Sequence, residues 1–293
     1  MLGERNFVAK HFPSLRAKAR LKRMSRSFAT RYRKLRRQLG LSSAPEDVRV
    51  EDRIGQGART QTIPTNVFHT AKSRLTHPMH QRSIEAFRDR NPGFSFRVFD
   101  DQATDDYMSQ EWSQHPIFDV YRKALIGQLR ADIFRYCIVF DQGGYYFDFN
   151  KSSETPLTEL HSPASGGVIS YERNVSLFPA PSEIRSVLDD PLRNVVQWGF
   201  GFRPRHGILG NAIDRIVELA PYFENQVFAF PKEAVLALSG PGLFTDAVRS
   251  WALSNGMKGI TQAGVEFGNT GPFRLRGARI TQRRSLHYSE LRD

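Results

Sequence analysis

One run near the middle of the sequence combines charged and polar residues at spacings that suit a binding site. Arg130 and Asp132 stand two residues apart in a stretch of helical periodicity, and a glycine pair, Gly143–Gly144, follows. A short apolar stretch then leads to Asp148 and Asn150. Polar side chains at i and i+2 of an extended segment point the same way, so these last two could hold a divalent cation or sugar hydroxyls together.

The elements that must position these residues alternate between predicted strands and helices. We predict strands over 63–70, 95–99, 145–149 and 167–171, and helical stretches over 78–90, 103–125, 126–140 and 209–220. Such alternation predicts an α/β fold with a mostly parallel sheet flanked by helices. In open sheets of this kind ligands bind at the carboxyl ends of the strands, where Asp148 and Asn150 fall.

Several chemistries are excluded by what the sequence lacks. It has no phosphate-binding Gly-x-x-x-x-Gly-Lys-Ser/Thr loop, no His-Glu-x-x-His and no Gly-x-Ser-x-Gly elbow. The single cysteine, Cys137, forms no internal disulfide and no cysteine-rich zinc site. No apolar run approaches the roughly 18 residues of a membrane-spanning helix, and no secretory signal is recognisable. We therefore expect a cytoplasmic protein.

The net charge of +12 is concentrated at one end of the chain. Residues 1–40 hold 13 Lys and Arg and one acid, whereas the remaining residues hold 29 basic and 29 acidic side chains. We predict a basic arm over 1–45, a linker over 46–61 and the α/β domain over 62–293. Within the arm an apolar stripe recurs at helical spacing: Leu21, Met24, Phe28, Tyr32, Leu35 and Leu39.

Three interpretations of this N-terminal basic amphipathic helix remain open from the residues alone. Residues 15–39 suit an anionic membrane surface, because the stripe can bury among headgroups while the cations meet acidic lipid. The stripe could instead pack on its own domain, or the cations could bind the phosphates of nucleic acid. We favour a peripheral position at the inner membrane face, and nucleic acid is the least favoured partner.

A series of short motifs, in order, resembles the Asp-x-Asp sugar-transfer region of glycosyltransferase family 32, the relatives of the yeast initiating mannosyltransferases. The similarity covers about residues 62–290. The motifs are Ile63–Pro64, His69–Thr70, Asn91-Pro-Gly-Phe94, Phe99-Asp-Asp101, Arg130-Ala-Asp132, Gly143-Gly-Tyr-Tyr146, Asp148-Phe-Asn150 and Pro156–Leu157.

This resemblance implies a GT-A fold, a Rossmann-like nucleotide-sugar domain, and a retaining hexosyltransferase. It implies that Asp132 and Arg130 bind the donor sugar and, with Asp148, form the catalytic set. Asp148, Asn150 and a late histidine, His287, would hold Mn²⁺ or Mg²⁺. The remaining donor-binding positions that it implies are Ile63, Pro64, Phe68, His69, Gly143, Gly144 and Tyr146.

One position departs from the family pattern, because Asn150 stands where the motif has its second acid. Replacing a carboxylate by an amide weakens a site for hard divalent cations. Either the donor diphosphate brings the metal with it, or a cation of the protein takes over part of its role, or the fold persists without catalysis. Candidate cations are Lys151, Arg283, Arg284 and His287.

The expected function is transfer of a sugar from a UDP- or GDP-sugar to a hydroxyl of a glycan or lipid-linked acceptor, as in polysaccharide biosynthesis at a membrane. The alternative is a non-catalytic nucleotide-sugar-binding relative that docks to membrane through its basic arm.

Overall fold

The computed structural model describes residues 46–56, 61–226, 228 and 231–269. The chain divides into two units, residues 1–46 and 47–293, and the fold described below belongs to the second. The predicted basic arm, and with it the predicted helix over residues 15–39, lies outside the described residues, as do Arg283, Arg284 and His287.

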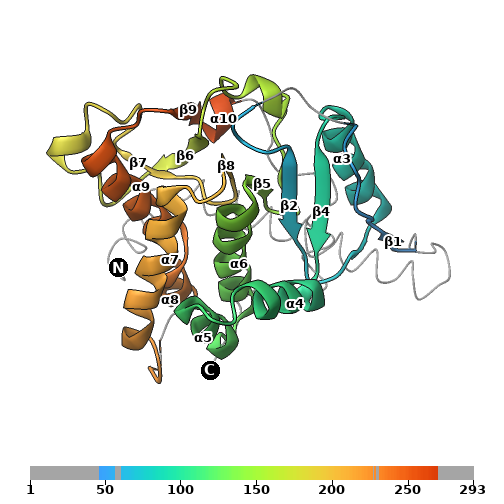
Figure 1. The fold of residues 1–293 in the computed structure, drawn as a ribbon, viewed down its shortest axis with the longest axis horizontal. Coiled ribbons are helices and arrows are strands. Elements are labelled where there is room, and N and C mark those ends of the chain that lie inside the picture. Colours follow the sequence, from blue (N-terminus) through green and yellow to red (C-terminus); the bar gives the residue numbers. More distant parts are fainter. Residues whose placement is uncertain (1–45, 57–60, 227, 229–230, 270–293) are drawn as a thin grey trace, which may run out of the picture. The chain divides into compact units, whose positions relative to one another are not determined.

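The described residues form one central mixed sheet (Figure 1). Its strands follow the order β4-β2-β5-β8-β6-β7, and β9 also pairs with β6. The bounds are β2 Asn66–Thr70, β4 Ser95–Phe99, β5 Gly144–Phe147, β6 Gly167–Val175, β7 Arg193–Val195, β8 Gly199–Phe202 and β9 Ile260–Val265. A separate ribbon pairs β1 Val48–Arg49 with β3 Leu75–Thr76.

The pairing confirms the predicted α/β class and adds an antiparallel part. Strands β4, β2 and β5 are parallel neighbours, and β9 is parallel to β6. Residues 193–202, which form β7 and β8, return antiparallel along β6, and β8 also pairs antiparallel with β5. A parallel return needs a crossover of a dozen or more residues, usually a helix, and residues 176–192 contain only the short 3-10 turn η2 Ser182–Ile184.

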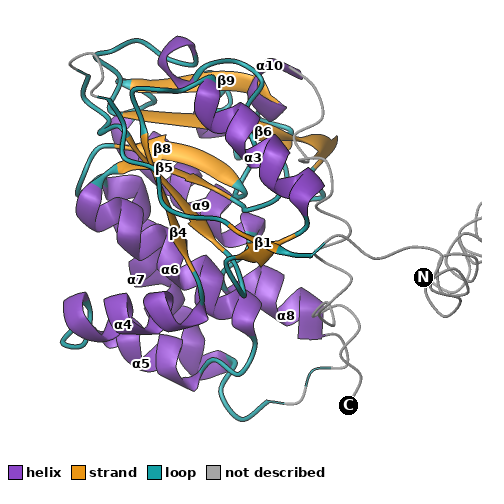
Figure 2. Cartoon of the chain, turned by 90° about the vertical axis from the view of Figure 1, so that its right-hand side faces the viewer, coloured by secondary structure: helices purple, strands orange, loops and turns teal. Residues whose placement is uncertain are grey.

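Helices cover both faces of the sheet (Figure 2). One face carries α6 Gly127–Gln142, α7 Gly207–Leu219 and α9 Pro241–Asn255, with α4 Asp101–Glu111, α5 Pro116–Lys123 and α8 Pro231–Leu238 beside them. The opposite face carries α3 Pro78–Asp89, the turn η1 Leu157–Glu159 and the short α10 Glu266–Asn269. The last turn, η3 Ala220–Tyr222, follows α7.

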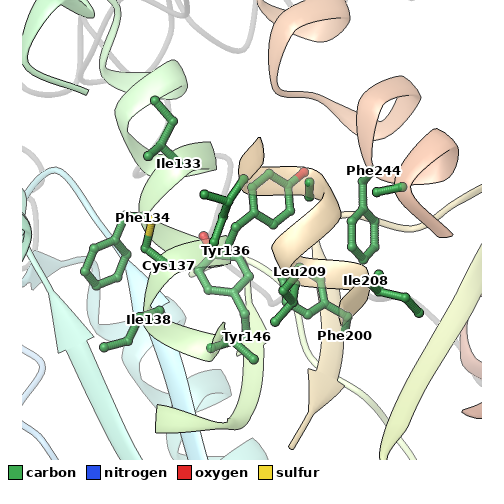
Figure 3. Packing of buried hydrophobic residues seen from close by; sticks show 14 of the residues in the cluster. Ile133, Phe134, Tyr136, Cys137, Ile138, Tyr146, Phe200, Ile208, Leu209 and Phe244 are labelled. Carbon is green, nitrogen blue, oxygen red and sulfur yellow. The ribbon is translucent and has the colours of Figure 1, made fainter. Parts of the chain in front are cut away.

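Side chains of β5 alternate between two hydrophobic clusters. Tyr146 faces α6 and packs with Tyr136 and Phe200 in the larger cluster (Figure 3). Tyr145 and Phe147 face the other way, and their rings occupy the space beside β8 that its two glycines leave open. A Cβ on Gly201 would lie 2.5 Å from the Tyr145 ring, which explains the Gly-Phe-Gly-Phe sequence of that strand.

Several helices begin at a side-chain cap that the sequence supplies. Asp100 accepts a hydrogen bond from Ala103 N at the start of α4. Histidine plays the same part at the starts of α3, α5 and α7, where Nδ1 of His77, His115 and His206 accepts from the backbone two residues on. Within the described ranges we find no helix with the length and apolar character needed to cross a membrane.

The described part of the predicted linker is packed against the sheet domain. Val50 is buried, and Arg53 bridges to Phe96 of β4. These contacts tie residues 48–53 to the edge of the sheet that β4 forms.

Candidate active site

Asp148 lies directly after β5, at the edge of the sheet where β2 and β4 also end. Its backbone N–H donates to Trp198 O (2.8 Å), just before β8 begins, and this contact fixes the end of the strand. The carboxylate is about one third exposed, and its Oδ1 accepts from the Tyr146 hydroxyl at 3.1 Å. Thr70 of β2 in turn bonds that hydroxyl at 2.8 Å. The ends of two parallel strands therefore meet at one carboxylate.

Helix α6 brings a second carboxylate to Asp148 through an arginine. Arg135 Nη2 lies 2.8 Å from Asp132 Oδ1 and 3.3 Å from Asp148 Oδ1. Both Arg135 and Asp132 are buried, with side chains only 2% exposed. The guanidinium also stacks over the Tyr146 ring, 4.6 Å from its centroid. We call Asp132, Arg135 and Asp148 the charged triad.

The triad carries one more negative than positive charge when both acids are ionised. Burial raises the pKa of Asp132 to about 6, while Arg135 and the Ser239 hydroxyl, which donates to Asp132 Oδ2 at 2.8 Å, oppose the rise. A desolvated carboxylate beside a partly exposed one can bind hydroxyls and attract a cation. Sequence reasoning missed Arg135, although its position three residues after Asp132 places both on one helix face.

The chain turns immediately after Asp148 and does not stay extended. Lys151 N donates to Asp148 O at 2.7 Å, which closes a turn over 148–151. Asn150 therefore does not follow the i, i+2 geometry that an extended segment would give it. Its Oδ1 is buried and has no hydrogen-bond partner among the described residues. The Lys151 ammonium lies 4.4 Å from the centroid of the Trp198 ring.

Two further acids were missed by sequence reasoning: Glu172, which lies near Lys151, and its neighbour Glu266. Glu172 of β6 and Glu266, which follows β9, are brought together by the parallel pairing of those strands. Burial, together with the charges of Glu266 and Asp148, raises the pKa of Glu172, and Lys151 opposes this. No local motif marks these acids, since nearly a hundred residues separate them in sequence.

Some predicted site residues lie at the other end of β5. Gly143 and Gly144 precede or begin the strand, with φ of 65° and 112°. A Cβ on Gly144 would lie 2.5 Å from Asn66 O, and one on Gly143 would meet Pro64 and Pro204. Ile63 is wholly buried in the smaller cluster. The structure groups these residues with one another, and not with Asp148.

His69 and Arg130 take separate positions. His69 is buried among phenylalanines, and its Nδ1–H donates to Phe147 O at 2.8 Å. Burial lowers the pKa of His69 to about 3, so the ring is neutral. Arg130 turns away from the charged triad, lying 3.4 Å from Asp105 of α4 and stacking over Tyr121. Arg130 is partly exposed and lies near the start of α6, as Asp132 does.

The oxygen donors present are compatible with a weakly held divalent cation. The Asp148 carboxylate and the unpartnered Asn150 Oδ1 are hard ligands of the kind that Mn²⁺ or Mg²⁺ prefers. The described residues contain no cluster of three or more His, Cys, Asp or Glu side chains arranged to hold a metal ion. Additional ligands would therefore have to come from a substrate, or from elsewhere in the chain.

Comparison with known proteins assigns this region to a class. A family model described as "Glycosyltransferase sugar-binding region containing DXD motif" matches residues 78–164, which include the charged triad. The match supports a glycosyltransferase and confirms the family 32 resemblance that the motifs indicated.

Individual relatives agree with that class. The chain is 25% identical over 198 residues to an initiation-specific alpha-1,6-mannosyltransferase of Schizosaccharomyces pombe, and 25% identical over 211 residues to the Candida albicans protein of the same name. Each match covers 64% of this chain, but the chain spans only about half the length of these relatives. Among solved structures, the PaToxG glycosyltransferase aligns with a TM-score of 0.47 and 16% identity, over 65% of this chain and 70% of that one.

Proposed function

We propose that this protein transfers a hexosyl group from a nucleotide sugar to a hydroxyl of a glycan or lipid-linked acceptor, with retention of configuration. The observation that carries the proposal is the charged triad, which lies at the ligand-binding edge of the sheet and within the matched sugar-binding region. The names of the curated relatives favour mannose as the sugar.

The reaction divides among the chain's own residues. In the transfer the bond from the anomeric carbon to the diphosphate breaks, and its electron pair leaves with the nucleoside diphosphate. The acceptor oxygen bonds to that carbon, and its proton leaves with the departing phosphate. Asp132 accepts hydrogen bonds from donor-sugar hydroxyls, and Arg135 holds both acids in place. The exposed part of Asp148 faces the donor, at the ribose or at the cation.

The chemistry of the diphosphate calls for positive charge. A divalent cation held by Asp148 and Asn150 would stabilise the charge that develops on the leaving group. Lys151 lies directly after this pair and supplies a fixed positive charge there whether or not a cation is bound. His287 remains a proposed additional ligand. Metal dependence is therefore expected to be weak.

The basic arm gives the proposal its location. We place the protein in the cytoplasm, peripheral to the inner membrane face, with residues 15–39 on anionic lipid. Each Lys or Arg near such a surface contributes about 1 kcal/mol, so several together hold the chain reversibly. Deleting residues 1–40 should abolish vesicle binding and leave donor hydrolysis intact.

Titration calorimetry with GDP- and UDP-sugars, with and without Mn²⁺, tests the site. Asp148→Ala is the test variant, and Asp119→Ala, an exposed acid on α5, is the matched control. We expect binding of one donor that the first variant loses and the control keeps. Absence of binding to every donor would overturn the proposal.

A turnover assay then distinguishes a transferase from the non-catalytic alternative. That alternative is tested because Asn150 stands where the motif has its second acid. Release of nucleoside diphosphate with an acceptor glycan present identifies the transferase. Donor binding at Asp148 without release, in the presence of mannoside acceptors, would identify a nucleotide-sugar-binding relative.

A further inference from the structure

The connection between β6 and β7 presents bulky apolar side chains to solvent. Leu177 is 90% exposed and Phe178 is 78% exposed. Val175, at the end of β6, is 62% exposed, and Leu192, just before β7, is 50% exposed. We call these four residues the apolar tip. Burying side chains of this kind is favourable, so leaving four together in water needs an explanation.

Hydrogen bonds and a small hydrophobic core hold the loop that carries the apolar tip. Ser176 N donates to Leu192 O at 2.9 Å, and the Arg249 guanidinium donates to Phe178 O at 2.9 Å. Below them Ala180, Ile184 and Leu188 form a small core with Ala252 of α9. The loop therefore has a hydrophobic interior of its own, and the exposed side chains are not part of it.

The tip and the candidate site share an edge of the sheet. Val168 of β6 and Tyr145 of β5 both pair with Gly201, so the two strands are in register there and run the same way. Three residues after Tyr145 and Val168 come Asp148 and Tyr171, which therefore lie at the same level of the sheet. Val175 lies four residues beyond Tyr171. The pairing of β6 with β7 is irregular between Tyr171 and Val175, so a regular rise of about 3.3 Å per residue sets an upper limit. The tip therefore begins no more than about 13 Å past the level of Asp148.

We propose that the apolar tip inserts into the headgroup boundary of an anionic bilayer. Leu177 and Phe178 are 90% and 78% exposed, so both side chains are accessible to a bilayer. The same chain carries 13 Lys and Arg against one acid in residues 1–40. Stable peripheral attachment generally needs two signals, and a polybasic segment with an inserted apolar element is such a pair.

The inference deepens the proposed function and, for the acceptor, rests on it. A tip buried 5 to 10 Å in the interface, the usual depth of such elements, would turn the edge that carries Asp148 toward the membrane. The acceptor hydroxyl would then belong to a molecule presented at that surface, such as a lipid-linked sugar.

Vesicle co-sedimentation of the full-length chain tests the inference. The probes are phosphatidylcholine vesicles with and without 30% phosphatidylglycerol. Leu177→Ser and Phe178→Ser are the test variants. Ile54→Ser is the matched control, since Ile54 is 89% exposed and lies near Phe94 and Ser95, at the opposite edge of the sheet. Each test variant should weaken binding to anionic vesicles by about tenfold, and the control should not.

The outcomes are separable. Equal binding by Leu177→Ser, Phe178→Ser and the control would overturn the inference. A change of sedimentation coefficient on mutating the tip, without a change in vesicle binding, would show that a second copy of the chain covers it. The assay contains no sugar donor, and Asp148→Asn should bind vesicles normally, so a failure of the proposed transferase function would not be mistaken for a failure of the tip.

Discussion

At the start of β5, Gly143 and Gly144 have positive φ and lie against Pro64, Pro204 and Asn66. At its end, four residues further on, Asp148 is joined through Arg135 to Asp132. One continuous motif thus spans two different regions. The glycine pair lies in closely packed backbone, whereas Asp148 belongs to a group of partly desolvated charges. The first region lets the strand begin in a closely packed place, and the second is where we propose that the donor binds.

The largest effect should come from Asp148. Asp148→Asn keeps the shape and the hydrogen bond from Tyr146 but removes the charge, so sugar transfer should fall by about 10²- to 10³-fold. The melting temperature should change little, because the carboxylate is partly exposed. Steady-state release of nucleoside diphosphate measures the rate of transfer, and scanning calorimetry measures the melting temperature. Unaltered turnover would remove the functional role of this end of β5.

Arg135 should matter most for stability. Arg135→Met leaves Asp132 buried without its cation, which should cost about 3 to 5 kcal/mol of the free energy of unfolding. The pKa of Asp132, already raised to about 6, should rise further. The folded state then binds a proton that the unfolded state releases above about pH 4, so stability falls as pH rises through that window. Urea unfolding at pH 5 and pH 8 should show the larger loss at pH 8.

The exposed Arg122 of α5 provides the control for that measurement, since Arg122→Met should change stability by less than about 1 kcal/mol. An equal loss at both pH values would contradict the assigned pairing.

Substituting a residue of the glycine pair should lower the stability of the fold and leave donor binding unchanged, because these residues pack against the backbone and do not contact the donor. Gly144→Ala places a Cβ 2.5 Å from Asn66 O at a positive φ, and should cost about 1 to 3 kcal/mol. Gly256→Ala, also at positive φ but with no neighbour within 4 Å, should cost less. Donor affinity per folded molecule should be unchanged in both. A donor affinity lost only in Gly144→Ala would show that this end of the strand contacts the ligand after all.

Buried histidines should make stability fall in acid. Burial lowers the pKa of His69 to about 3 and those of His80 and His206 to about 4, so they stay neutral while the unfolded chain takes up protons below about pH 6.5. Stability is fully present above that pH and falls, by about 1.4 kcal/mol per pH unit for each histidine, toward pH 4. His206→Asn keeps an N-cap acceptor and should make the slope shallower between pH 6 and pH 5 in urea titrations.

Arg130 should give the smallest effect. It is partly exposed and paired with Asp105, so Arg130→Gln should leave stability nearly unchanged. As a cation at the site edge it should still attract an anionic donor, and the variant should bind it about two- to fivefold more weakly, with the difference vanishing in 1 M salt. A loss of affinity that persists in high salt would place Arg130 in direct contact with the donor.

The sequence was most informative where structure is local. The strands β2, β4 and β5 and the helices α3 and α6 were predicted within a few residues, because their periodicity and glycine or proline boundaries depend on neighbouring residues. The proximity of Asp132 and Asp148 follows from a helix leading directly into a strand. Arg135 was missed because an arginine among apolar residues gives no signal until its two acidic partners are located in space.

Long-range pairing could not be predicted from local patterns. The return of residues 193–202 along β6 depends on a segment with no helix, and the neighbourhood of Glu172 and Glu266 depends on β9. Asn150 was expected to point with Asp148, but the hydrogen bond from Lys151 N to Asp148 O turns the chain. Each miss involves a partner far away in sequence or a single backbone bond.

The late partner of β6 also constrains how the protein can be made. Strand β9 begins at Ile260, about ninety residues after the strand that it pairs with. At about 5 to 20 residues per second, a ribosome would need roughly 5 to 20 s to deliver it. Throughout that interval nascent β6 has an open hydrogen-bonding edge, the kind that recruits other chains. Yield in cells should therefore be sensitive to translation speed between residues 175 and 265.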